Sequence, residues 1–328
     1  MGRRRSLCIA IAVMLLCLPA RNAFAGDSLP SWNDTPTKKA IEDFVEKVTG
    51  EGSPDFVKPA ERIAVFDNDG TLWCEQPTYV QLVFALDRVK TLAPQHPEWK
   101  DQPPFKAVIE GDMQAVAASG VKGMLDITLA SHSGISNEAF DGILKDWLKT
   151  ARHPRFDKPY PELVYQPMLE LLSYLRAKGF KTYIVTGGGI EFVRAFAEKS
   201  YGVPPEQIVG SMGELKLESP DGKVMLMKEP KLAFLDDGPG KAIGIANAIG
   251  RRPIMAFGNS DGDLQMLQYT TTGDGARFAL YVHHTDAERE YAYDRESKVG
   301  RLDKGLDEAA KRGWTVVDMK HDWKVVFP

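Results

Sequence analysis

Two aspartates separated by one residue are the first side chains in this sequence that could do chemistry together. Asp67 and Asp69 flank Asn68, and Gly70 follows them. Glycine adopts backbone conformations that other residues avoid, so Gly70 allows a sharp turn that brings both carboxylates toward one small volume. Two acids in one pocket repel each other, and a divalent cation relieves that repulsion. Because Mg²⁺ prefers carboxylate and carbonyl oxygens, the segment indicates a magnesium site.

A threonine followed by glycines, and a lysine further along the chain, could bind an anion beside these acids. Thr186 offers a hydroxyl next to Gly187 and Gly188, whose backbone N–H groups can turn toward an anion where a helix begins. Phosphate is the natural anion for such a turn. Lys241 adds a positive charge that would offset the charge on transferring phosphoryl oxygens.

A third polar segment offers more oxygen ligands to the far side of a metal ion. It contains Asn259, Asp261 and Asp263. Taken together, the carboxylates, the lysine, the hydroxyl and the glycine turn describe phosphoryl transfer assisted by a metal ion.

Each polar segment follows a short apolar run that is typical of a buried strand. These runs span residues 63–66, 181–185 and 253–257, and helical patterns at 167–178, 190–200 and 241–249 alternate with them. The alternation predicts an α/β fold with a parallel sheet covered on both faces, and ligands of such sheets bind at the carboxyl ends of the strands. All three polar segments fall at such ends.

The remaining chain is divided among smaller elements. Residues 35–48 predict an amphipathic helix, and residues 78–157 predict a mainly helical insertion. We expect a hairpin at 214–218 and 223–227 that stands outside the main sheet. Strands at 278–282 and 315–317 and a helix near 286–293 complete the expected order.

The ordered motifs resemble those of the haloacid dehalogenase superfamily. The four matching segments are residues 66–72, residues 185–188, Lys241 and residues 258–263, and the resemblance covers about residues 63–267. It is greatest to the phosphoserine-phosphatase-like branch, in which a helical cap is inserted between the first and second motifs. The resemblance implies a Rossmann-like three-layer core with a parallel sheet and a mainly helical cap.

The resemblance also implies a role for each motif residue. Asp67 would be the nucleophile that forms an aspartyl-phosphate, and Asp69 would be the general acid and later the base. The Asp67 carboxylate and the backbone carbonyl of Asp69 would hold Mg²⁺. Thr186, with Gly187 and Gly188, would bind the phosphoryl group, and Lys241 would steady the nucleophile and the phosphoryl charge.

The fourth motif departs from the family pattern. Asn259 stands where the family usually has an aspartate, and Asp261 and Asp263 follow. By alignment Asn259 is the inner metal ligand and Asp263 an outer or water-mediated one, whereas a differently wound turn would put Asp261 in place of Asn259. A neutral ligand should weaken metal affinity relative to a carboxylate.

Several residues near the first motif and in the insertion have weaker assignments. Trp73, Glu75 and Gln76 join the core to the expected cap and are candidate gate or specificity residues. His132 lies in the expected cap and is interpreted as a surface or hydrogen-bonded histidine. Cys74 lacks the neighbours that a nucleophilic thiol needs.

The amino-terminal residues predict an export signal. Arg3, Arg4 and Arg5 precede an apolar run at residues 7–18, and residues 23–25 read Ala-Phe-Ala. We therefore expect a signal peptide at residues 1–25, cleavage before Gly26, and a periplasmic or secreted protein. The expected core then spans residues 26–77 and 158–328, and the expected cap spans 78–157.

The sequence as a whole favours a hydrolase of small phosphorylated molecules. The formal net charge of −4 and the lack of a basic run in the mature chain give no support to nucleic acid binding. We expect a Mg²⁺-dependent phosphomonoesterase with no membrane contact after cleavage and no obligate protein partner. Two alternatives stay open: a phosphotransferase or mutase of the same superfamily, and a phospholigand-binding protein without turnover.

Overall fold

Strand β1 (Ile63–Phe66) lies at the centre of the sheet, and all four of its residues are buried. The computed structural model describes residues 27–328. Strand β1 pairs in parallel with β2 (Lys181–Gly189) on one side and with β5 (Met255–Gly258) on the other. Further out, β3 (Ile208–Glu218) pairs with β2, β6 (Phe278–Thr285) with β5, and β8 (Thr315–Asp318) with β6, all in parallel.

The parallel strands have the order of a Rossmann fold. They lie side by side as β3, β2, β1, β5, β6 and β8, which in chain order is 3-2-1-4-5-6. Two antiparallel strands complete the sheet, β4 (Met225–Phe234) beside β3 and β7 (Ala292–Tyr293) beside β6. The chain therefore reverses direction across the sheet between β1 and β5, and this switch point is where such folds bind ligands.

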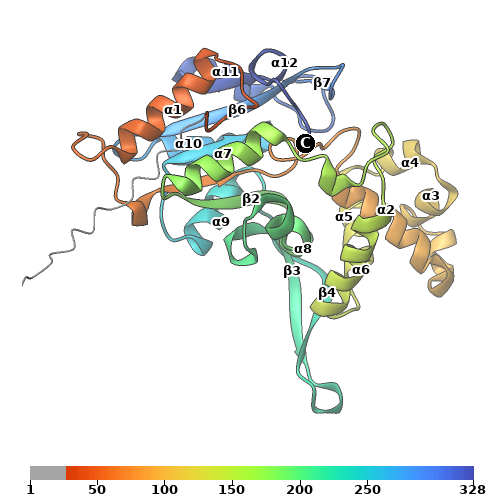
Figure 1. Cartoon of the computed structure of the whole chain (residues 1–328). Coiled ribbons are helices and arrows are strands. Elements are labelled where there is room, and N and C mark those ends of the chain that lie inside the picture. The colour runs from red at the N-terminus through yellow and green to blue at the C-terminus, as the bar shows by residue number, and fades with distance from the viewer. Residues whose placement is uncertain (1–26) are drawn as a thin grey trace, which may run out of the picture.

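Helices cover both faces of the sheet (Figure 1), because successive residues of each strand point to opposite sides. Ala64 and Phe66 pack in one cluster with helices α1 (Pro36–Thr49), α7 (Gln166–Ala177) and α8 (Ile190–Tyr201). Ile63 and Val65 pack in the other cluster, which includes residues of α9 (Pro239–Ala248), α10 (Leu264–Thr271) and α11 (Lys304–Arg312). These layers confirm the predicted Rossmann-like α/β core.

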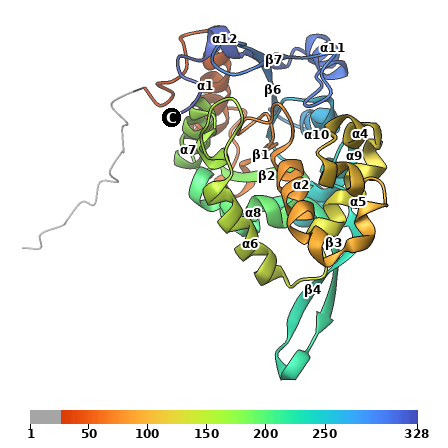
Figure 2. The ribbon, with the colours of Figure 1, turned by 90° about the vertical axis from the view of Figure 1, so that its right-hand side faces the viewer.

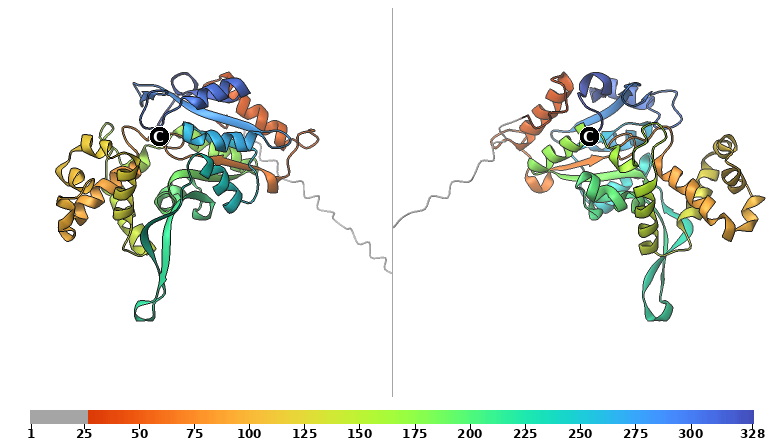
Figure 3. Two further views of the ribbon diagram at one scale, coloured as in Figure 1. Left: turned by 180° about the vertical axis from the view of Figure 1, so that it is seen from behind. Right: turned by 45° about the vertical axis from the view of Figure 1, so that its right-hand side comes forward.

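A group of helices between β1 and β2 stands to one side of the sheet (Figure 3). It comprises α2 (Val80–Leu92), α3 (Phe105–Glu110), α4 (Met113–Ala118) and α5 (Gly120–His132), which share a small apolar core of their own. Helix α6 (Asn137–Thr150) instead places Phe140 and Leu144 in the main core. The predicted helical insertion is therefore present, and its last helix packs with the main body.

A long β-hairpin projects from the body (Figure 2). Residues Ile208 to Gly210 of β3 pair with β2 inside the main sheet, whereas the distal part of β3 pairs with β4, for example Leu217 with Leu226. The predicted hairpin strands are thus parts of longer strands. Residues Leu215 to Glu218 pair with β4 alone, as predicted, whereas the first residues of β3 join the main sheet. The apolar run at residues 208–210 is too short to identify a strand from sequence.

The predicted helix near residues 286–293 was also wrong. Asp286 instead accepts backbone N–H groups of Glu288 and Arg289, both at 3.1 Å, and so forms a turn before β7. The helix in this part of the chain is α11, and α12 (Met319–Asp322) follows β8. Short 3₁₀ helices occupy Pro59–Glu61, Ala93–Gln95, Pro97–Lys100, Tyr160–Glu162, Pro205–Gln207, Pro220–Gly222 and Asp261–Asp263.

The predicted signal peptide at residues 1–25 lies outside the described residues. Within residues 27–328, none of the helices combines the length and the apolar character that a membrane span requires.

Candidate active site

The polar segments named above meet at the carboxyl ends of β1, β2 and β5. Asp67 directly follows β1, and its backbone N–H donates to the Phe257 carbonyl of β5 at 2.9 Å. Asn259 directly follows β5. A cavity of about 410 Å³ opens at this edge, and Asp67, Asp69 and Lys241 are among the residues that border it. The sheet topology therefore brings residues from distant parts of the sequence into one site.

Lys241 is the buried cation at the base of the site. Its Nζ donates to Asp67 Oδ1 at 2.5 Å, to Asp263 Oδ1 at 2.6 Å and to the Val185 carbonyl at 3.0 Å. Burial alone would lower the pKa of Lys241, but the charges of Asp263 and Asp67 raise it above its usual range. The ammonium group therefore stays charged and fixes one oxygen of Asp67.

Asp67 is itself buried, and burial together with the nearby Asp263 carboxylate raises its pKa well above the usual range. Its second oxygen, Oδ2, has one contact, the Thr71 hydroxyl at 3.5 Å. A carboxylate held at one oxygen and nearly free at the other can attack an electrophile that enters the cavity.

Trp73 orients the second aspartate. The indole N–H of Trp73 donates to Asp69 Oδ1 at 2.9 Å, and the ring stacks on Phe196 with centroids 4.5 Å apart. Burial raises the pKa of Asp69. A carboxyl group that keeps its proton more readily is suited to act as a general acid. Trp73 is thus placed beneath Asp69 rather than at a gate.

Gly70 allows this loop to close. Its φ of +75° is rarely adopted by other residues, and a Cβ at this position would lie 2.0 Å from the amide nitrogen of Asn259. His284 donates its Nε2–H to the Gly70 carbonyl at 2.7 Å, because a carbonyl oxygen can only accept. The loop is therefore held against both Asn259 and β6.

The glycine run after β2 borders the cavity, but Thr186 does not. Gly187, Gly188 and Gly189 line the cavity, whereas Thr186 is completely buried and its hydroxyl oxygen accepts the backbone N–H of Gly188 at 3.0 Å. In this arrangement the glycines face an incoming anion, and Thr186 shapes their turn.

The two aspartates of the fourth motif, Asp261 and Asp263, have different environments. Asp263 binds Lys241 with one oxygen, and its other oxygen accepts the backbone N–H groups of Asn259 and Ser260, each at 3.0 Å. Asp261 turns away from the cavity, because its Oδ1 accepts the N–H groups of Asp303 and Gly305 at the start of α11. The sequence-based alternative with Asp261 as the inner metal ligand is therefore not what this structure presents.

Glu75 brings an additional carboxylate to the site. Its Oε1 accepts the amide N–H of Asn259 at 2.6 Å and the Tyr293 hydroxyl at 2.8 Å. Glu75 is buried and borders the cavity, and burial and the Asp69 charge raise its pKa well above the usual range. Sequence reasoning found Glu75 only as a gate residue, because its contacts with Asn259 and Tyr293 span 184 and 218 positions.

The donor atoms fit a hard divalent cation. Among the described residues, no group of three or more His, Cys, Asp and Glu side chains is arranged to hold a metal ion by itself. Mg²⁺ needs fewer protein ligands, since it keeps several waters and takes one or two carboxylates. Asp67, Asp69, Glu75 and Asp263 place four carboxyl groups in one pocket. Burial raises the pKa of the first three, and neighbouring acids raise the pKa of Asp67 and Glu75 further. A cation near Asp67, the Asp69 carbonyl and the Asn259 amide oxygen would relieve the repulsion among these acids.

On the cap side of the cavity, the polar side chains bind one another. Gln81 Oε1 accepts the Gly189 N–H at 2.8 Å, and its amide nitrogen lies 3.0 Å from His132 Nε2. Lys228 pairs with Glu191 at 3.2 Å. Burial lowers the pKa of His132 to about 3, so this histidine is neutral. Gln81 links the cap to the glycine run, a role that no sequence pattern indicated.

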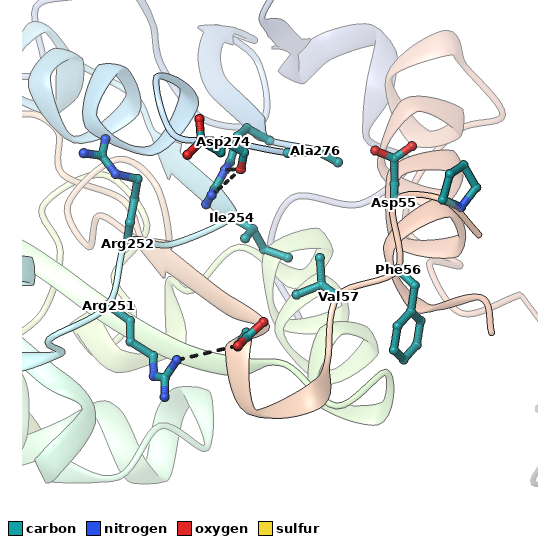
Figure 4. A pocket seen from close by; sticks show the side chains of 12 residues that line it. Asp55, Phe56, Val57, Arg251, Arg252, Ile254, Asp274 and Ala276 are labelled. Carbon is teal, nitrogen blue, oxygen red and sulfur yellow. Dashed lines mark hydrogen bonds and ion pairs between the residues drawn. The ribbon is translucent and has the colours of Figure 1, made fainter. Parts of the chain in front are cut away.

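A second hollow lies at the opposite edge of the sheet (Figure 4). It is lined by residues that precede β1, β5 and β6, including Phe56, Arg251, Arg252 and Asp274. Arg252 lies over the Tyr269 ring, 3.9 Å from its centroid, and Arg251 reaches Glu61 at 4.0 Å. None of the predicted site residues borders this hollow. We therefore place the reaction site at the carboxyl edge.

The fold and the acidic pocket together define a Rossmann-like α/β protein with a helical cap and a site at the carboxyl ends of its strands. More specifically, the model of the haloacid dehalogenase-like hydrolases matches residues 64–268, which is more than half of the 328-residue chain. The chain belongs to this family, as the sequence motifs predicted. The insertion of cap helices between β1 and β2 also agrees with the predicted branch of the family.

Solved structures with similar folds include two proteins of unknown function. The one from Anaerococcus prevotii DSM 20548 has a TM-score of 0.55 and 17% identity, covering 88% of this chain and 93% of that chain. The one from Bordetella pertussis Tohama I has a TM-score of 0.50 and 15% identity, and the match covers 79% of this chain and 99% of that chain. A phosphoserine phosphohydrolase-like protein from Francisella tularensis has a TM-score of 0.40 and 18% identity, and the match covers 76% of this chain and 99% of that chain. A search of curated proteins finds no significant match.

Proposed function

We propose that this hydrolase is a phosphomonoesterase that acts through an aspartyl-phosphate on Asp67. The observation that carries the proposal is the 2.5 Å contact between Lys241 and one oxygen of Asp67, with Asp69 on the same cavity and held by Trp73. This geometry supplies a fixed nucleophile, a positive charge and a proton donor, which are the groups that phosphoryl transfer requires.

In the first step, an oxygen of the Asp67 carboxylate attacks phosphorus. The bond between phosphorus and the leaving-group oxygen breaks, and that oxygen takes the proton of Asp69. Lys241 offsets negative charge on the phosphoryl oxygens. Gly187 and Gly188 line the cavity where these oxygens would lie, and the Thr186 hydroxyl holds the Gly188 N–H in the turn.

In the second step, Asp69 acts as the base. It takes a proton from water, the water oxygen attacks phosphorus, and the bond between phosphorus and Asp67 breaks. Phosphate leaves, and both aspartates return to their starting forms.

We further propose that the bound metal ion is Mg²⁺. The Asp67 carboxylate, the Asp69 carbonyl and the Asn259 amide oxygen would hold it, with Glu75 behind Asn259. When bound, the ion would neutralise charge on the phosphoryl oxygens. The remaining carboxylates, Asp263 and Glu75, hold Lys241 and Asn259 in place.

A periplasmic or secreted location is also part of the proposal. Its support is the basic and then apolar sequence of residues 1–25 with Ala-Phe-Ala at its end. Cell fractionation of the full-length chain, with N-terminal sequencing of the product, should find a protein that begins at Gly26 outside the cytoplasm. A protein retained in the cytoplasm with residues 1–25 attached would contradict this.

A panel of phosphate esters with and without Mg²⁺ tests the activity. We expect the protein to release phosphate in the presence of Mg²⁺, and Asp67→Asn to lose roughly a thousandfold or more of the rate. Asp261→Asn is the matched control, because this acid lies in the same motif but faces α11. Failure to hydrolyse any ester while Mg²⁺ binds would sink the proposal, and full activity of Asp67→Asn would sink the mechanism.

A further inference from the structure

Cap helix α5 has a second apolar face, which borders the cavity. Ile127, on one side of the helix, is buried in the core of the cap. Val121, Met124, Leu125 and Leu129, at helical spacing on another side, border the same cavity as Asp67. A surface helix normally has one apolar face, so a second one facing a cavity indicates a contact with something outside the chain.

The opposite wall of the cavity is apolar as well. It is formed by the segment from β3 to the end of β4, where Met212 and Leu235 border the cavity and remain 41% and 56% exposed. Val121 on the cap side is 86% exposed. Large apolar side chains left in water around one cavity are a recurrent sign of a ligand site, because burying them against a ligand is favourable.

The polar groups on this side of the cavity offer little to an anionic leaving group. Gln81 is bound to Gly189 and His132, and Lys228 is paired with Glu191. Because of this ion pair and the neutral His132, the described residues on this side of the cavity include no free cation for a second phosphate or a carboxylate. Two other acids lie on this wall, Glu229, which is half-buried, and Asp237, which is exposed. Water can solvate both carboxylates, and both repel anions.

We infer that the natural substrate is the phosphate monoester of an uncharged, apolar alcohol, with an alkyl or aryl group that lies between α5 and the end of β4. The inference rests on the proposed phosphatase activity and narrows it. The phosphoryl group would sit at Asp67 and the glycine run, and the cavity of about 410 Å³ has room for both parts of such a molecule.

A series of alkyl phosphates tests this inference. The esters of ethanol, butanol and hexanol differ only in apolar length, and we expect kcat/KM to rise by about fourfold for each methylene that becomes buried. Phosphoserine, phosphocholine and glycerol phosphate serve as charged or polar comparisons. A flat series, or a charged ester that is hydrolysed better than hexyl phosphate, would overturn the inference.

A pair of variants locates the apolar contact. Leu125→Gln should flatten the dependence on chain length, whereas Leu217→Gln, on the projecting hairpin and 68% exposed, should leave it unchanged. The dependence is a ratio between substrates, so it is insensitive to the fraction of folded protein. Equal dependence in both variants would overturn the placement. Absence of hydrolysis with every ester would instead mean that the proposed activity itself is wrong.

Discussion

At the scale of single residues, the site differs from the family pattern in where its acids come from. Asn259 carries no charge at the position where the family usually has an aspartate, but Glu75 lies 2.6 Å from its amide nitrogen. The Glu75 carboxyl group, from the loop after β1, therefore accepts a hydrogen bond from the neutral Asn259 of the fourth motif. Because Asn259 donates to Glu75, its amide oxygen is left on the side that faces Thr71 and Asp67.

Replacing Glu75 should weaken metal binding. Glu75→Gln removes the charge behind Asn259, and groups that orient a ligand in this way typically change metal affinity by about tenfold or more. Titration calorimetry with Mg²⁺ measures the affinity without requiring turnover. Asp261→Asn, which removes an acid that faces α11, should leave the affinity unchanged. If Asp261→Asn weakened binding and Glu75→Gln did not, the assignment of these two acids would be reversed.

Replacing Trp73 should change the pH dependence of catalysis. The indole N–H stabilises the charged form of Asp69 and so lowers its pKa, against the larger effect of burial, which raises it. Trp73→Phe removes that hydrogen bond, so the pKa of Asp69 rises further and the acid keeps its proton to higher pH. The descending limb of kcat/KM should therefore move to higher pH. Trp314→Phe, in contact with Tyr281 on the other face of the sheet, is the control and should not move it.

At the scale of elements, the connection from β4 to α9 contains an unusual buried acid. Asp236 is fully buried, neither of its carboxylate oxygens has a hydrogen-bond partner, and a Cβ on Gly244 of α9 would lie 2.2 Å from its Oδ1. Burial raises the pKa of Asp236 from 3.8 to about 7. The folded protein therefore favours the protonated form, and an ionised Asp236 opposes folding.

Replacing Asp236 with asparagine should stabilise the protein at high pH. With a pKa of 3.8 unfolded and about 7 folded, the penalty is absent below the first value, grows between the two and is complete above the second. The gain in the free energy of unfolding should be near zero at pH 4 and of order 1–3 kcal/mol at pH 8. Urea unfolding of both proteins at these two pH values measures it. A gain that is the same at both pH values would show that Asp236 does not titrate as its burial implies.

Elements and site residues differ in how far the sequence predicts them. The strands before Asp67, Thr186 and Asn259 were found because short apolar runs end in polar turns, and their order along the chain was enough to indicate the sheet. The helix expected near residues 286–293 was wrong because the hydrogen bonds of Asp286 favour a turn. Local patterns predict local structure, and side chains that act locally, as Asp286 does, can override them.

At the scale of the whole molecule, contacts between segments that are distant in the sequence determine the roles of residues that the sequence did not predict. The roles of Glu75, Gln81 and Tyr293 depend on the packing of cap, core and carboxyl-terminal loops, and their partners lie 51 to 218 positions away. The side of the turn on which Asp261 lies depends on the position of α11. No single pattern encodes these contacts, whereas the placement of Asp67 follows from the sheet topology, because Asp67 directly follows the central strand β1.

Several layers of the molecule contribute residues to the site. The carboxyl edge of the sheet supplies Asp67, and helix α9 supplies Lys241. The cap supplies Gln81 and the apolar face of α5, and the segment after β4 supplies Leu235. In the proposed function, chemistry and leaving-group recognition would come from different layers. The hydrogen bond between Gln81 and Gly189 joins these layers.

Trapping of the covalent intermediate tests the central role of Asp67 most directly. The enzyme would be mixed with a hydrolysable phosphate ester and Mg²⁺, quenched in acid during turnover, and digested for mass spectrometry. The account predicts a phosphoryl group on the peptide that contains Asp67, attached to Asp67 and absent from Asp67→Asn. Continued turnover with no phosphoryl group on Asp67, or with the group on Asp69 instead, would contradict it.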